Sequence, residues 1–186
     1  ERDSTSLVNN LIEALLCDRQ GDLWVGSGKG LQLYSPYEDA FKNVTFVDGN
    51  KPSVLHLQEL HTGEIWAVTA GYGVYSIDKE KMEATSLVHV NDLCSSTFMH
   101  NIHQDSYHRI WIALPNGKIV RITSDLKDVE LIGSSSDALG KVYTILEDLK
   151  GRTWVAAVAG VYLWNEDEHR LIRMEQPDNT FIGVRG

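Results

Sequence analysis

The stretch LIEALLCDRQGDLWVGSGKGLQLY, residues 11–34, contains the pattern that decides the fold. It combines an apolar run, an Asp, a Gly turn, a Trp in a strand-like segment, a second Gly turn and a further strand-like segment. The same order recurs three more times along the chain, and the tryptophans are spaced 42, 45 and 43 residues apart. A period of this length indicates one supersecondary unit that is repeated.

When the four copies are aligned, residues of the same type recur at four positions. The first position is occupied by Trp24, Trp66, Trp111 and Trp154. The second position, six or seven residues later, is occupied by Gly30, Gly73, Gly117 and Gly160. Asp18, Asp105 and Asp148 stand six residues before their tryptophans, with Leu60 in this place in the second copy. Gly21, Gly63 and Gly151 stand three residues before, with His108 as the exception. We expect structural roles for all of them: indoles packed between units, glycines at positive φ or close approaches, and Asp carboxylates accepting bonds from turn N–H groups.

Each copy predicts four short antiparallel strands, because Val, Ile, Tyr, Trp and Thr dominate its apolar runs and no sustained helical period is present. A four-stranded antiparallel unit of about 40–45 residues is typical of a β-propeller blade. The sequence therefore predicts an all-β fold with four-stranded blades at about residues 8–48, 52–91, 97–133 and 140–175. Residues 179–186 would begin a fifth blade. We expect residues 1–186 to form one propeller unit, as part of a larger propeller.

Written as I..L..D..G.LW.G...GL..Y, the pattern of residues 11–34 resembles the two-component regulator propeller repeat. The resemblance extends over nearly the whole chain, from about Val8 to Met174. It implies the periplasmic sensor portion of a bacterial hybrid two-component sensor kinase, in which propellers of seven or so blades precede a membrane helix. It also implies carbohydrate sensing, with oligosaccharides as the usual ligand and the rest of the sensor kinase chain, including its histidine kinase, as the partner.

Composition excludes several other classes of protein. The 186 residues carry 17 Lys and Arg against 26 Asp and Glu, a formal charge of −9, which disfavours nucleic acid as a partner. The longest nearly unbroken apolar run is residues 154–164, too short to insert into a membrane. Cys17 and Cys94 lie far apart, and we expect two plain thiols. The opening ERDSTS suggests a mature fragment or an excised domain.

The sequence shows no convincing catalytic constellation and no nucleophile, metalloprotease or phosphate-loop motif, so we expect no catalytic residue, no metal and no cofactor. Glu166 and Asp167 stand in a polar turn and are interpreted as a solvated loop.

A ligand is expected at the propeller rim shared by two sets of loops. Lys29, Tyr72 and Asn116 come from the turns between second and third strands, and Asn50, Lys51, Asn91 and Asp92 from the links between blades. Tyr72 is the best aromatic candidate for a sugar ring, because it stands between Gly71 and Gly73.

Two alternatives remain open. A propeller lyase or hydrolase would need polar groups near the axis, and His56, His100 and Tyr143 could supply them. A protein-interaction scaffold is the other. Blades at the ends of an open series expose apolar faces, so self-association with another copy, or closure as a small ring, is also expected.

Overall fold

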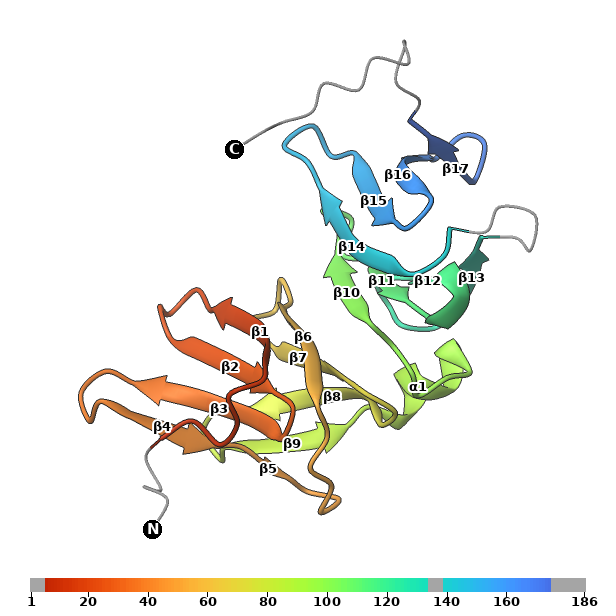
Figure 1. The fold of residues 1–186 in the computed structure, drawn as a ribbon. Helices are drawn as coiled ribbons and strands as arrows, with labels where there is room; N and C mark the ends of the chain where they lie inside the picture. Colours follow the sequence, from red (N-terminus) through yellow and green to blue (C-terminus); the bar gives the residue numbers. More distant parts are fainter. Residues whose placement is uncertain (1–5, 134–138, 175–186) are drawn as a thin grey trace.

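The structure is a computed structural model that describes residues 6–133 and 139–174, and it consists of four antiparallel sheets that follow one another along the chain (Figure 1). Blade 1 contains β1 (Ile12–Cys17), β2 (Leu23–Ser27), β3 (Gly30–Ser35) and β4 (Ala40–Asn43). Blade 2 contains β6 (Val54–Glu59), β7 (Ile65–Thr69), β8 (Gly73–Asp78) and β9 (Glu83–Ser86). Blade 3 contains β10 (Asn101–Gln104), β11 (Ile110–Ala113), β12 (Ile119–Ile122) and β13 (Val129–Ile132). Blade 4 contains β14 (Val142–Glu147), β15 (Thr153–Ala157), β16 (Gly160–Asn165) and β17 (Arg170–Arg173).

The first strands of the blades, β1, β6, β10 and β14, contact one another in chain order. Figure 1 shows that the blades follow an arc around these strands, with blades 1 and 4 at its two ends. The predicted all-β propeller class is therefore confirmed. The start of the fifth blade, predicted at residues 179–186, lies outside the described residues.

Two elements differ from the prediction of four plain blades joined by loops. β5 (Thr45–Phe46) leaves blade 1 and pairs in parallel with β9, so the sheet of blade 2 has five strands. The link between blades 2 and 3 contains the short helix α1 (Val88–Cys94). The helix forms because Val90 and Cys94 are buried in the core between these blades and Asn91 bonds to blade 2. No helix in the described part of the chain is long and apolar enough to cross a membrane.

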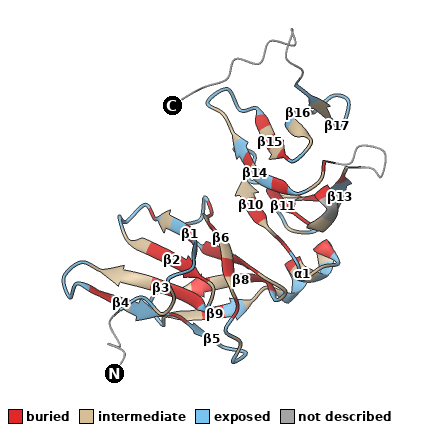
Figure 2. Ribbon diagram, viewed as in Figure 1, coloured by how far each residue is buried: buried red, intermediate tan, exposed pale blue. Residues whose placement is uncertain are grey.

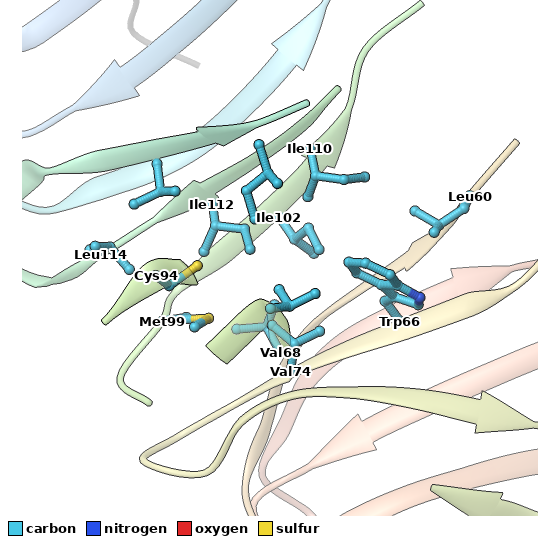
Figure 3. Close-up of a cluster of buried hydrophobic side chains, with 13 residues drawn as sticks. Leu60, Trp66, Val68, Val74, Cys94, Met99, Ile102, Ile110, Ile112 and Leu114 are labelled. Atoms are coloured by element: carbon cyan, nitrogen blue, oxygen red, sulfur yellow. The ribbon is translucent and has the colours of Figure 1, made fainter. Parts of the chain in front are cut away.

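The core lies between consecutive blades (Figure 2). Trp24 packs with Leu57 and Ala67 of blade 2, and Trp111 packs with Ile145 and Val155 of blade 4. Figure 3 shows the middle interface, where Trp66 and Val68 face side chains of blade 3 such as Ile102 and Ile110. The first three repeat tryptophans are thus buried between blades.

Trp154 differs because the described chain places no blade beside it. Its indole is half-buried, and a shallow apolar depression of about 330 Å³ remains over blade 4, lined by Thr144, Leu146, Asp148, Trp154, Ala156 and Val161. We call this surface the uncovered face of blade 4.

Each repeat Asp holds both its turn and its tryptophan. The Oδ1 atom of Asp105 accepts hydrogen bonds from the backbone N–H groups of Tyr107 and Arg109, at 3.0 and 2.9 Å. Its Oδ2 atom accepts a bond of 2.8 Å from the indole N–H of Trp111. The same indole-to-carboxylate bond joins Trp24 to Asp18 and Trp154 to Asp148, at 3.0 and 2.8 Å. The turn role was predicted; the bond to the indole was not.

Backbone N–H groups of one blade also bond to the end of the first strand of the next. The N–H of Arg19 donates to Oε2 of Glu59, that of His61 to Oε1 of Gln104, and that of Ser106 to Oε2 of Glu147, at 2.6–3.0 Å. These polar contacts fix the register between neighbouring blades at the edge of the apolar core.

Residues 166–167 are exposed, as the interpretation of a solvated loop expects, but Glu166 also makes contacts that the sequence did not indicate. Its Oε1 atom accepts hydrogen bonds from Arg109 and Arg121 of blade 3, at 2.7 and 2.9 Å, and its Oε2 atom accepts one from Trp164. Burial alone would raise the pKa of Glu166, but these three donors lower it to about 2. The exposed carboxylate of Glu166 therefore joins blades 3 and 4, whereas no such contact is present for Asp167, which is also exposed, within the described residues.

Both cysteines are free thiols, as expected, Cys17 exposed and Cys94 buried. Burial raises the pKa of Cys94 to about 12, so this thiol stays protonated at neutral pH.

Replacing Asp105 by Ala is expected to cost more stability than replacing Asp148 by Ala. Both carboxylates bond to a Trp indole and to an Arg four residues later, but Asp105 and Trp111 are buried and Trp154 is half-exposed to water. A buried donor left without an acceptor costs about 1–3 kcal/mol, and water can replace the acceptor at Trp154. Urea unfolding at pH 7 measures both free energies; equal losses would contradict this account of the bond.

Glu166→Gln is expected to lower stability at neutral pH but not in acid. The folded pKa of about 2 lies below the ordinary 4.5, so the carboxylate stabilises the fold above about pH 4.5, and this contribution is lost as pH falls towards 2. The free energies of unfolding of the variant and the native chain should therefore converge between pH 4.5 and 2. The control is Glu168→Gln, a carboxylate of similar exposure that pairs with Arg170 of its own hairpin and joins no second blade among the described residues. A gap that does not change with pH would be the contrary result.

Candidate functional site

One end of the arc carries the turns β2–β3, β7–β8, β11–β12 and β15–β16 together with the links between blades. We call this end the link rim, and the end with the remaining turns the opposite rim. The assignment follows from the antiparallel order of every blade, because alternate turns of such a sheet lie at opposite ends. All the predicted ligand-binding residues belong to loops of the link rim.

A cavity of about 310 Å³ opens at this rim between blade 1 and the link to blade 2. Lys29 lines it from the β2–β3 turn, and Asn50 and Lys51 line it from the link. Leu31 and Phe46 contribute apolar surface. Both lysines are exposed and Asn50 is half-buried. The structure thus brings together three residues that the sequence placed on one rim.

The link is held in place by Tyr75 of blade 2. Its hydroxyl donates a 2.6 Å hydrogen bond to Oδ2 of Asp48, and the Asn50 amide donates to the same hydroxyl at 3.5 Å. The Asn50 backbone N–H bonds to Oδ1 of Asp48 at 3.0 Å, and the Tyr75 ring meets Phe46 edge-on at 4.9 Å. The cavity wall is therefore fixed before any ligand arrives.

At neutral pH the hydroxyl of Tyr75 is protonated and the carboxylate of Asp48 is ionised. Burial and the bond to Asp48 raise the pKa of Tyr75 to about 12, so its hydroxyl remains a donor. Desolvation alone would raise the pKa of Asp48, but the bonds from Tyr75 and Asn50 lower it overall. Tyr72 also contributes to the rise at Tyr75. The sequence reasoning missed both Asp48 and Tyr75, although residues 48–50, DGN, are a turn signal.

Tyr72 lies at the tip of the β7–β8 turn, and its side chain is 44% exposed. Gly71 and Gly73 on either side have φ angles of +81° and +79°, so the turn has the shape that the sequence predicted. Tyr72 does not line the cavity of Lys29 and Lys51.

The other three candidates lie apart from this cavity. Asn91 is on α1, where Oδ1 accepts a 2.8 Å bond from the Val74 N–H and the amide donates to Ser86. A Cβ on Gly73 would lie 2.3 Å from Oδ1 of Asn91, so the amide fills the space that this glycine leaves. Asp92 is exposed on the same helix. Asn116 stands in the turn at Pro115–Gly117, and its side chain is outside the described part.

The three residues of the enzymatic alternative form no linked group. No hydrogen bond connects His56, His100 and Tyr143 within the described chain, and Tyr143 is 60% exposed. Burial lowers the pKa of His56, with a further contribution from His103, and lowers that of His100, so the neutral imidazoles are favoured. The described residues contain no group of three or more His, Cys, Asp or Glu side chains that could hold a metal ion.

Comparison with known proteins supports the sequence resemblance. Residues 6–29 match the sequence model of the family described as Two component regulator propeller, which confirms the predicted resemblance in the first copy. None of the curated proteins matches the chain in sequence.

Several solved structures share the fold. Two are extracellular domains from B. thetaiotaomicron described as parts of hybrid two component systems. The first is 23% identical, over 87% of this chain and 22% of its own length, with a TM-score of 0.74. The second is 23% identical, over 94% and 26%, with a TM-score of 0.75. Virginiamycin B lyase from Staphylococcus aureus is 14% identical, over 95% and 59%, with a TM-score of 0.67. The chain spans about a quarter of the two extracellular domains, and at these identities the likeness establishes the propeller fold alone.

Proposed function

We propose that this chain is a non-enzymatic ligand-sensing module from the periplasmic part of a bacterial hybrid two-component signalling protein, and that it responds to an oligosaccharide. The observation that carries this proposal is the combination of the propeller-repeat match at residues 6–29 with the likeness to extracellular domains of such systems. The rest of the sensor kinase chain would be its partner.

The link rim supplies groups suited to a saccharide. A sugar presents hydroxyls to planar polar groups and C–H faces to aromatic rings. Asn50 in the cavity and the exposed ring of Tyr72 provide one group of each kind on adjacent loops of the rim. Both are held by rigid blades, so a ligand can bind without ordering a long loop.

Sensing requires that the ligand prefers one arrangement of the blades over another. A ligand in the cavity would touch the β2–β3 turn of blade 1 and the link that Tyr75 fixes to blade 2. Its differential affinity would shift the population of arrangements, and the shift would pass to neighbouring domains of the signalling protein.

The proposal predicts binding without turnover. Isothermal titration with oligosaccharides from several bacterial and plant polysaccharides should find at least one ligand, and incubation with the parent polysaccharides should release no reducing ends or unsaturated products. Turnover that disappears in His56→Ala or Tyr143→Phe would instead establish the enzymatic alternative. If the chain captures peptides and none of its preparations binds a saccharide, the protein-interaction scaffold would be favoured.

We further propose that the uncovered face of blade 4 associates with a second copy when the 186 residues are prepared alone. On blades 1–3 the corresponding surface is covered by the next blade. On blade 4 no described blade covers the same kind of surface, so Trp154 is half-exposed. An apolar surface of this kind is a usual site of association.

Val161→Lys should therefore shift the chain towards monomer in light scattering after gel filtration. Val161 is 46% exposed and lies on the uncovered face, so a charge there opposes burial. The control is Val129→Lys, at a valine that is 44% exposed on the outer strand of blade 3. A native chain that is monomeric at high concentration, or two variants that behave alike, would disprove the association.

A further inference from the structure

The link rim and the opposite rim differ in charge although the chain as a whole is acidic. The described loops of the link rim contain four lysines and two carboxylates. The lysines are Lys29, Lys51, Lys118 and Lys141, and the carboxylates are Asp48 and Asp92. The turns of the opposite rim contain thirteen Asp and Glu residues against seven Lys and Arg. The described loops therefore form a basic end and a strongly acidic end, and an anion is steered towards the basic one.

The cavity described above concentrates this charge. Lys29 and Lys51 reach it from two different loops, and within the described chain neither forms an ion pair. Lys42, Lys79 and Lys81, by contrast, are paired with nearby carboxylates. Two ammonium groups beside one cavity, without acidic partners among the described residues, leave room for an external anion.

Asp48, a carboxylate close to this cavity, is already engaged. Both oxygens of Asp48 accept hydrogen bonds, Oδ2 from Tyr75 and Oδ1 from the Asn50 N–H. Asp48 thus holds the shape of the link, and it does not line the cavity. The lining itself contains Lys29 and Lys51 as its charged side chains, with Asn50 and the apolar surface of Leu31, Val44 and Phe46.

We propose that this cavity binds an anionic saccharide, one that carries carboxylate or sulfate groups, with Lys29 and Lys51 as the anion-binding residues. This inference rests on the proposed function for the saccharide and on the charge distribution for the anion. The ammonium groups bind the acidic substituents, the Asn50 amide a hydroxyl, and the apolar surface the C–H face of the ring. A volume of about 310 Å³ is at the small end of ligand pockets, so one or two sugar units enter it.

The test uses a pair of probes whose main difference is charge: a trisaccharide of galacturonic acid and its fully methyl-esterified form, with a sulfated disaccharide as the second anionic probe. Isothermal titration of the native chain should detect binding of at least one anionic probe that is ten times or more tighter than binding of the ester. Side-chain amide signals of Asn50 should move in the NMR spectrum during the same titration. Raising the salt concentration should weaken binding.

Two double variants that lose the same charge distinguish the effect of the cavity lysines on anion affinity from the effect of net charge. Lys29→Met with Lys51→Met removes both ammonium groups of the cavity but keeps most of each stem, and anion affinity should fall tenfold or more. Lys127→Met with Lys150→Met removes two exposed lysines of the opposite rim, and affinity should stay within twofold. All four side chains are exposed, so both double variants should fold.

Equal binding of acid and ester, or equal losses in the two double variants, would overturn the inference. So would the absence of binding by both anionic probes. The proposed function has a separate readout, since neutral oligosaccharides that bind the native chain and the Lys29/Lys51 variant alike would leave the sensor proposal standing and remove only the anionic site. Failure of every saccharide, neutral or charged, would remove both.

Discussion

The packing of one indole against the next blade is the interaction on which the fold depends. An aromatic side chain buries about 150–250 Å², or about 4–6 kcal/mol at 25 cal/mol per Å², whereas a hydrogen bond contributes about 1 kcal/mol. Blade 2 separates the two effects: Leu60 replaces the Asp, Nε1 of Trp66 is buried without a partner among the described residues, and yet the indole is only 2% exposed. Packing therefore holds the blades together, and the Asp mainly sets the orientation of the ring and the turn.

The sequence predicted the features that are encoded locally and repeated. The turn before each tryptophan is an example of a feature encoded by the repeat. Even where His108 replaces the turn glycine in the third copy, the backbone keeps the left-handed conformation, with a φ of 64°. β5 and α1 were not predicted because neither has a local signal. Two residues of β5 pair with a strand about 38 positions later, and a helix of seven residues is stable only through its packing.

The candidate site was predictable to a similar degree. An antiparallel meander fixes which loops share a rim, and this was enough to place Lys29, Asn50 and Lys51 together. The cavity itself depends on side-chain volumes, and the bond from Tyr75 to Asp48 joins residues 27 positions apart. Asn91 was expected to bind a ligand from a loop, but its side chain fills the space beside Gly73 and accepts a hydrogen bond from Val74, which the sequence did not indicate.

The blade junctions differ in what joins them, and under the proposed function this difference would bear on signalling. Blades 3 and 4 are joined by Glu166 with Arg109 and Arg121, in addition to their apolar core. Blades 1 and 2 are joined by the β5 link, which pairs with β9 and is fixed by Tyr75. Under the proposed function, a ligand in the cavity would contact this link and the turn of blade 1 at once, so its binding energy would act across one junction. Trp24, Trp66 and Trp111 each pack against the next blade, so under the proposed function these contacts are the route by which a change at that junction would reach the neighbouring blades.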